Sequence, residues 1–244
     1  MSEAQATELV VVNGFEIRVD VDRPLVDGLL VPTVAALIPR DADGTRRFVF
    51  LAAPPGTGKS TLAAVVERRA AHLDLDTVGI DGFHHPQSYL DTHELDGVPL
   101  ASIKGAPETF DVTRLRQFLE RSATEATRWP VYDRGRHDVV PDARPVEAGL
   151  VLLEGNWLLL DEPGWRELST HSVFNVFIDA DPALLRDRLI ERKVRGGLDL
   201  PAATRFYERS DRPNIDRVLA GTDRRKVDLL LRLHADGTIH REDT

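Results

Sequence analysis

A short stretch near residue 55 combines two prolines, two glycines, a lysine and three hydroxyl side chains. It reads Ala53-Pro54-Pro55-Gly56-Thr57-Gly58-Lys59-Ser60-Thr61. Glycines let the backbone curl so that several N–H groups point at one anion, and a helix that starts here adds the positive end of its dipole. A lysine can then bind phosphate oxygens, while a serine hydroxyl is an oxygen ligand of the kind that Mg²⁺ takes. We therefore expect these nine residues to bind the phosphates of a nucleotide.

This stretch resembles the P-loop pattern G-x-x-x-x-G-K-[ST], with Ala53 in place of the first glycine. An apolar run precedes it, helical spacing follows it, and Lys59 is the only lysine among the first hundred residues. The resemblance implies that Lys59 contacts the β- and γ-phosphates of ATP and that Ser60 binds Mg²⁺. The flanking elements and the lysine disfavour the alternative, a turn that holds no ligand.

A second candidate is Asp81, in Asp81-Gly82-Phe83-His84-His85, which follows the apolar run TVGI. Ligands of open α/β sheets bind at the carboxyl ends of the strands. Asp81 lies 22 residues after Lys59, far enough for one helix and one strand, so the two should meet there. A carboxylate at that place can take the proton of an attacking hydroxyl during phosphoryl transfer. The alternative is a solvated turn.

Two other classes of P-loop protein compete with a kinase. The string PPGTGKS is also similar to that of the AAA+ ATPases, but the apolar run LVLLE ends at Glu154-Gly155 without an Asp-Glu pair. Asp-x-x-Gly occurs at 41–44 and 161–164, as in GTPases, but no Asn-Lys-x-Asp sequence for reading guanine is present.

A basic helix is expected over 182–195, ending at Gly196-Gly197. Arg188, Arg192 and Arg195 recur at spacings that place them on one helical face. Such a face suits the charge of a triphosphate, and we assign Arg188 and Arg192 to ATP binding and catalysis. A solvated arginine face in an arginine-rich chain is the alternative.

Polar side chains in 84–111 and 132–138 could bind an acceptor with several hydroxyl groups. The candidates are His84, Tyr132, Arg134 and His137. A zinc site from His84, His85 and His93 matches no standard spacing. His84 has a structural role as its alternative, and the three tryptophans are read as core residues.

Short apolar runs alternate with helical spacing through most of the chain, which predicts an α/β fold: three layers around a mostly parallel sheet. The expected strands are 48–52, 77–80, 129–132, 150–154, 173–178 and 227–233, followed by a polar tail; the expected helices are 59–73, 112–121, 182–195 and 202–208.

Residues 1–45 have a different pattern and are expected to form an N-terminal extension packed on a kinase domain of residues 46–244. Alternating residues around Asn13-Gly14 predict a β-hairpin over 8–21. A helix is expected over 24–39, with Pro24 in its first turn, and a turn over 41–44.

Several further strings extend the resemblance to one family over residues 46–233. They are Lys104-Gly-Ala-Pro-Glu-Thr-Phe-Asp111, Pro130-Val-Tyr-Asp-Arg134 with His137-Asp138, Glu154-Gly-Asn-Trp157, and Phe206-Tyr-Glu-Arg209 with Pro213-Asn214. In this order they resemble the phosphoribulokinase/uridine kinase group of P-loop kinases, which includes bacterial-type pantothenate kinase and fructose kinase-like proteins.

The resemblance implies a P-loop NTPase fold and an ATP-dependent phosphotransferase with an alcohol acceptor. It implies that Asp81 is the base, contacting the acceptor, and that Glu154 faces the substrate and Mg²⁺, the metal through water. Residues 182–200 would form a mobile lid over ATP, and the segments around His84, Tyr132, Arg134 and His137 would line the acceptor pocket.

Composition limits the remaining classes. The 244 residues carry 31 basic and 40 acidic side chains, a net charge of −9, which disfavours nucleic acid as a partner. No cysteine is present, and the acidic start lacks a signal-peptide pattern, so we expect a cytoplasmic protein without membrane association. The hairpin edge could pair with a second copy to form a homodimer.

The identity of the acceptor stays open, because a sugar, a nucleoside and pantothenate all fit the pattern. The alternative to a kinase is a P-loop ATPase or a nucleotide-sensing regulator. A retained Asp81 disfavours a sensor, since binding alone requires no base.

Overall fold

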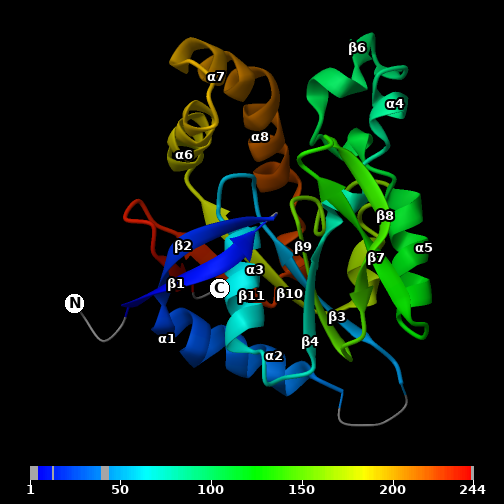
Figure 1. The fold of residues 1–244 in the computed structure, drawn as a ribbon, viewed down its shortest axis with the longest axis vertical. Helices are drawn as coiled ribbons and strands as arrows, with labels where there is room; N and C mark the ends of the chain where they lie inside the picture. Colours follow the sequence, from blue (N-terminus) through cyan, green and yellow to red (C-terminus); the bar gives the residue numbers. More distant parts are fainter. Residues whose placement is uncertain (1–4, 13, 40–43, 243–244) are drawn as a thin grey trace.

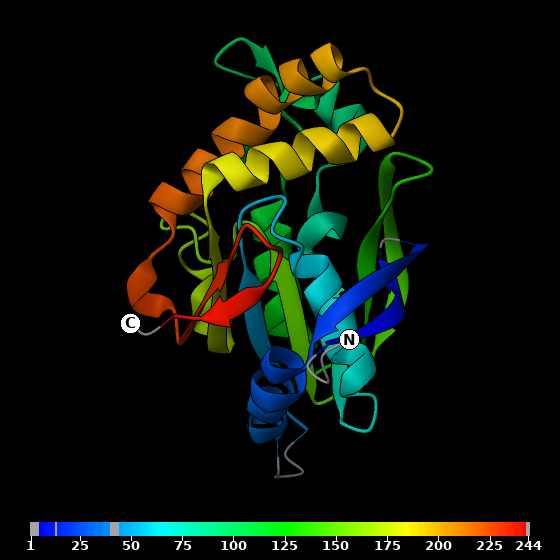
Figure 2. The same cartoon turned by 90° about the vertical axis from the view of Figure 1, so that its left-hand side faces the viewer.

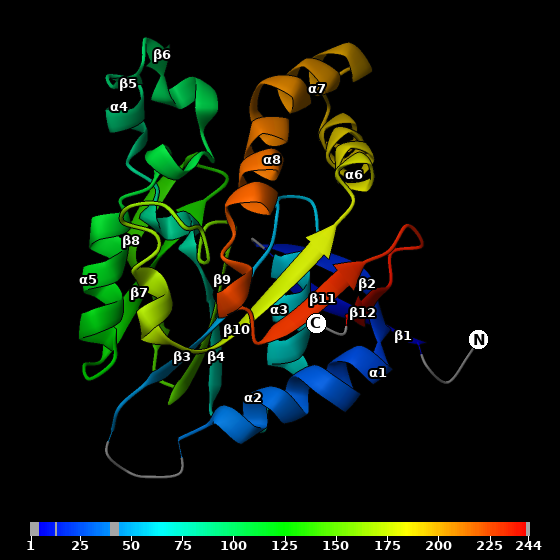
Figure 3. The same cartoon turned by 180° about the vertical axis from the view of Figure 1, so that it is seen from behind.

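The computed structural model describes residues 5–12, 14–39 and 44–242. Its centre is a six-stranded sheet in the order β12-β11-β10-β3-β9-β4, in which every neighbouring pair is parallel except β11 and β12 (Figures 1 and 3). The strands are β3 (Arg47–Ala52), β4 (Leu75–Gly79), β9 (Leu150–Gly155), β10 (Ser172–Ala180), β11 (Leu229–Leu233) and β12 (Ile239–Arg241). The predicted α/β fold with a mostly parallel sheet is confirmed.

Both faces of this sheet are buried, each in its own apolar cluster. Along β3, Val49 and Leu51 belong to one cluster, while Phe48 and Phe50 belong to the other. Helix α3 (Lys59–Arg69) contributes to the first cluster and α5 (Val112–Ser122) to the second. This arrangement explains the uninterrupted apolar runs, because a strand covered on both faces has no solvent side.

Two groups of shorter elements stand beyond the carboxyl ends of the parallel strands, at the top of Figure 1. One group is α6 (Pro182–Arg195), α7 (Leu200–Phe206), the π-helical η6 (Tyr207–Asp211) and α8 (Arg212–Gly221). The other is α4 (Gln87–Leu90), β5 (Glu94–Leu95), β6 (Val98–Pro99), η3 (Leu100–Ile103) and η4 (Pro107–Thr109). Three further 3₁₀ turns are η2 (Ile80–Phe83), η5 (Leu168–His171) and η7 (Arg224–Lys226).

In the described part of the chain, no helix is long and apolar enough to span a membrane.

The prediction that 129–132 is a strand of the central sheet is wrong. Strand β7 (Thr127–Asp133) pairs instead with β8 (Asp138–Val146) in an antiparallel hairpin of its own. Its register shifts between Trp129 and Val131, that is, at Pro130. Proline has no N–H to donate, so this segment cannot serve as a fully bonded inner strand.

Several element boundaries also differ from the expectations. The helix expected over 59–73 ends at Arg69, and the polar tail contains β12. The helix expected over 202–208 does not end there but continues through η6 into α8. The π turn of η6 comes just before Pro213. A widened turn at this place accommodates a proline that cannot donate a helical hydrogen bond.

The N-terminal residues form the expected hairpin and helix. Strands β1 (Gln5–Val12) and β2 (Phe15–Asp22) pair in antiparallel fashion beside α3 (Figure 2). One helical segment follows, made of α1 (Arg23–Leu25), the π-helical η1 (Val26–Leu30) and α2 (Val31–Leu37). Asn13 and residues 41–43 of the two predicted turns lie outside the described residues. The division of the chain at residue 45 stays a prediction.

Gly82 should be intolerant of any side chain. A Cβ atom there would lie 2.0 Å from the carbonyl oxygen of Pro130 in β7, which is backbone and cannot rotate away. We predict that Gly82→Ala lowers the free energy of unfolding by about 2 kcal/mol or more, measured by denaturant titration. Gly28→Ala is the control, since nothing lies within 4 Å of its Cβ position. Equal stability of the two variants would contradict this packing.

Candidate active site

The predicted phosphate-binding turn joins β3 to α3. Gly56 and Gly58 both have φ of +90°, a conformation that glycine adopts readily, and Gly58 is the residue from which α3 starts. The hydroxyl of Thr57 donates to the carbonyl oxygen of Pro54 at 3.0 Å and so closes the turn. Ala53, at the position of the missing glycine, is fully buried in the core.

The first two residues of α3 contact the carboxylate at the end of β9. The hydroxyl of Ser60 donates to Oε1 of Glu154 at 2.8 Å, and Nζ of Lys59 lies 3.6 Å from Oε2. Burial raises the pKa of Glu154 above its ordinary value; Lys59 and Ser60 oppose this shift, and the charge of Asp81 adds to it. A hydroxyl and a carboxylate side by side are the oxygen donors that fit Mg²⁺.

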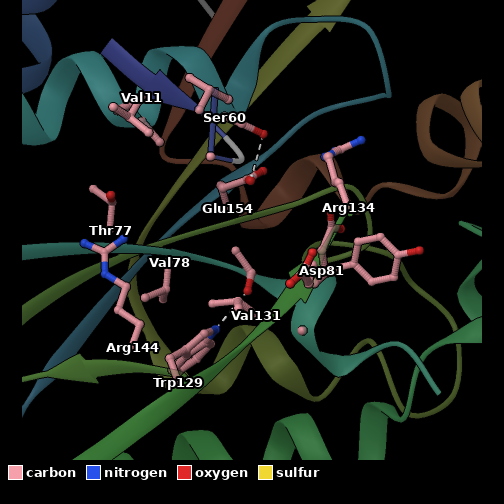
Figure 4. Close-up of a pocket in the computed structure, with 18 of the residues that line it drawn as sticks. Val11, Ser60, Thr77, Val78, Asp81, Trp129, Val131, Arg134, Arg144 and Glu154 are labelled. Carbon is pink, nitrogen blue, oxygen red and sulfur yellow. Dashed lines mark hydrogen bonds between the residues drawn. The ribbon is translucent and has the colours of Figure 1, made fainter. Parts of the chain in front are cut away.

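Asp81 stands at the start of η2, directly after β4, and lines one cavity with Ser60 and Glu154 (Figure 4). Its backbone carbonyl accepts hydrogen bonds from the amide and from Nδ1 of His84, at 3.2 and 2.9 Å. Among the described residues, its carboxylate has no hydrogen bond or ion pair. A carboxylate held by its backbone but left free at its oxygens can accept a proton.

Helix α6 lies against the phosphate-binding turn. Nη2 of Arg188 is 3.6 Å from the Cβ position of Gly58, and Leu189 packs at 3.0 Å from that of Gly56. Burial lowers the pKa of Arg192, and the positive charge of Arg134 lowers it further. The negative charges of Asp211 and Asp81 oppose this shift. Although Arg192 is exposed, its interactions with Arg134 and Asp81 place it within electrostatic reach of the cavity. Arg195, on the expected arginine face, is 76% exposed and pairs with Glu191.

Of the four residues expected to bind the acceptor, two line the cavity and two do not. Tyr132 and Arg134 line the cavity. His84 is buried, and its ring packs on Phe110 with centroids 3.7 Å apart. The side chain of His137 is not among the lining residues; its backbone carbonyl accepts from Nζ of Lys104 at 3.3 Å.

The cavity has a volume of about 530 Å³, and several residues in or beside it were not predicted as site residues. Lys104, beside it, lies 4.6 Å from the centre of the Tyr132 ring and donates to Gln87 at 2.7 Å. Because lysine is rare in this chain, the presence of Lys104 could have marked it as a candidate site residue. Other lining residues come from α3, β4, β8 and the N-terminal hairpin, and no sequence pattern marks them: Glu67, Thr77, Arg144, Val11, Val12 and Phe15.

Comparison with known proteins identifies the family. No protein-family model matches the chain. An uncharacterized Escherichia coli (strain K12) protein, YggC, is 41% identical over 235 residues, which cover 94% of this chain and 96% of that protein. A crystal structure described as a candidate fructose transport system kinase from Silicibacter sp. is 30% identical, covers 79% of this chain and 93% of that one, and has a TM-score of 0.72. The chain belongs to the phosphoribulokinase/uridine kinase-like family of P-loop kinases.

The likeness to better-known members of the family is partial. Pantothenate kinase of Lactiplantibacillus plantarum is 33% identical over 144 residues, which cover 55% of this kinase and 45% of that enzyme. The kinase thus spans about half the length of the pantothenate kinases that it matches.

The burial of His84 predicts that acid lowers the stability of the kinase. Burial lowers the pKa of His84 from its ordinary value of 6.5, so below pH 6.5 the unfolded chain takes up a proton that the folded chain does not. Stability contributed by neutral His84 is therefore lost as pH falls. We predict that, between about pH 7.5 and about pH 5, Tm falls more steeply for wild type than for His84→Gln. The exposed His72→Gln is the control, and equal slopes in all three proteins would contradict the prediction.

Proposed function

We propose that this kinase transfers the γ-phosphoryl group of ATP to a hydroxyl group of a small polar metabolite, with Asp81 as the general base. The observation that carries the proposal is the unpaired carboxylate of Asp81, in one cavity with Ser60 and Glu154 beside the phosphate-binding turn. A protein that only binds or hydrolyses ATP has no use for an acceptor cavity next to that turn.

The turn of residues 53–61 would hold the phosphates through its backbone amides, and Lys59 would bind the β- and γ-phosphate oxygens. Ser60 and Glu154 would hold Mg²⁺, Glu154 through water, since their oxygens already lie 2.8 Å apart. When bound, the ion neutralises phosphate charge. Lys59 at 3.6 Å favours the ionised form of Glu154 and so opposes the rise in its pKa that burial causes.

In the transfer step, Asp81 takes the proton of the acceptor hydroxyl as its oxygen attacks the γ-phosphorus. A new P–O bond forms to the acceptor, and the bond from the γ-phosphorus to the bridging oxygen breaks, so that ADP leaves with that electron pair. Arg188, beside the turn, and Arg192, near Asp81, would stabilise the charge that spreads over the transferred group.

The acceptor would lie between Asp81 and the β7–β8 hairpin, where Tyr132 and Arg134 line the cavity. His84 would act by positioning the Asp81 turn, since its Nδ1 donates to the Asp81 carbonyl at 2.9 Å. We further propose that residues 182–200 form a lid over ATP, and that the kinase works in the cytoplasm, where ATP is produced. A pairing of hairpin edges into a homodimer and the predicted contact of His137 with the acceptor remain proposals.

Asp81→Asn tests the base. The amide keeps the shape of the carboxylate but cannot take a proton, so we expect acceptor-dependent ADP release from Mg-ATP to fall by about 10²- to 10⁴-fold. ATP affinity, measured by calorimetry, should stay within about twofold. The acceptor pool contains sugars, polyols, nucleosides and pantothenate, and Asp187→Asn, at a 75% exposed side chain, is the control. ADP release that is independent of acceptor and survives in Asp81→Asn would indicate an ATPase instead.

Arg192→Ala tests transition-state stabilisation by α6. Loss of a guanidinium near the transferred group should lower kcat by about 10²-fold or more, with a smaller effect on the KM for ATP. Arg212→Ala is the matched control, because Arg212 is 59% exposed and pairs with Glu208 and Asp216 in its own helical arm. A kcat equal to that of Arg212→Ala would remove Arg192 from the mechanism.

A further inference from the structure

The tip of the N-terminal hairpin forms one wall of the cavity that contains Asp81. Val11, Val12, Gly14 and Phe15 line the same space as Asp81 and Glu154, and Figure 4 shows Val11 on the side of the cavity next to Ser60. This hairpin lies outside residues 46–233, which carry the family's motifs. The acceptor cavity of this kinase is therefore completed by a segment that those motifs do not include.

The face that the hairpin turns inward is apolar from Val10 to its tip. Cross-strand partners share a face, and the pairs Val10↔Ile17 and Val12↔Phe15 follow one another along it. Val10 is buried in the core at 5% exposure, whereas Phe15, at the end of the same face, is 64% exposed. The apolar surface thus continues beyond the core and ends at the cavity.

The hairpin is fixed to the helix that begins at the phosphate-binding turn. Glu8 pairs with Arg69 of α3 at 2.7 Å, and Arg68 donates to the carbonyl oxygen of Leu9 at 2.8 Å. Ser60 is at the other end of the same helix. Because a helix is stiff over three turns, the apolar wall and the phosphate-binding turn have a set relative position.

The two regions of the cavity differ in chemistry. Asp81, Tyr132 and Arg134 supply polar groups where transfer would occur, and Glu67, Thr77 and Arg144 supply others from α3, β4 and β8. The side chains of Val11, Val12 and Phe15, from the hairpin, are hydrocarbon. Val78 and Val131 extend the apolar lining from β4 and β7. A free sugar would leave this apolar lining exposed to water. A ligand with an apolar ring would cover the lining, and burial of apolar surface is favourable in proportion to the area covered.

We infer that the acceptor carries an apolar or aromatic ring attached to its hydroxyl-bearing part, and that Phe15 at the hairpin tip selects for that ring. This inference rests on the proposed function, because it takes the cavity beside Asp81 as the acceptor site. A ring-bearing glycoside or nucleoside fits this description, and a free hexose or pentose does not.

The test compares acceptors in matched pairs: D-glucose with phenyl β-D-glucoside, and D-ribose with uridine. For wild type we expect kcat/KM to favour the ring-bearing member by about 10-fold or more. Phe15→Ala should lose most of this preference through a higher KM, with kcat and the KM for ATP unchanged. Leu9→Ala is the matched control: Leu9 is 48% exposed on the other face of the hairpin and is not among the cavity residues.

A wild-type preference for the bare sugars would overturn the inference, and so would a preference that survives equally in Phe15→Ala and Leu9→Ala. Absence of ADP release with every acceptor would count against the kinase proposal instead. Equilibrium dialysis of phenyl β-D-glucoside and D-glucose then decides the inference. Binding of the glucoside that Phe15→Ala weakens supports it, and no preference for the glucoside contradicts it.

Discussion

The contact between Glu154 and the first two residues of α3 is the constraint around which the candidate site is organised. It joins the end of β9 to the phosphate-binding turn, through 2.8 Å to Ser60 and 3.6 Å to Lys59. A buried carboxylate is unfavourable unless charge and hydrogen bonds compensate it, so Glu154 holds Lys59 and Ser60 where they are. The neighbouring Gly79 leaves room for it, since a Cβ there would lie 3.0 Å from Oε1.

Electrostatics make this edge of the sheet different from the rest of an acidic protein. The net charge is −9, yet Lys59, Arg134, Arg188 and Arg192 gather around the turn and the cavity. Many other arginines in the described part of the chain form ion pairs, as Arg217 does with Glu108 and Glu162. These four cations lie close together beside the turn and the cavity, and such a cluster favours an anionic ligand; a triphosphate supplies that charge.

The cavity is assembled from five parts of the chain that are distant in sequence: the hairpin, α3, β4 with Asp81, β7–β8, and the end of β9 with Glu154. The phosphate end comes from strings that resemble those of the kinase family, whereas the apolar end comes from the N-terminal hairpin. In the proposed function, phosphoryl transfer and the choice of acceptor therefore depend on different segments of one pocket.

The sequence by itself determined the phosphate-binding turn, the strand-end position of Asp81 and the alternation of strands and helices. These are local properties, carried by glycines, prolines and runs of apolar residues close together in the chain. Only the tertiary structure decided that β7 leaves the central sheet at Pro130, that His84 is buried against Phe110, and that Phe15 lines the cavity. Each of these depends on which distant segments pack together, and such contacts produce no periodic pattern of residues that could be recognised in the sequence.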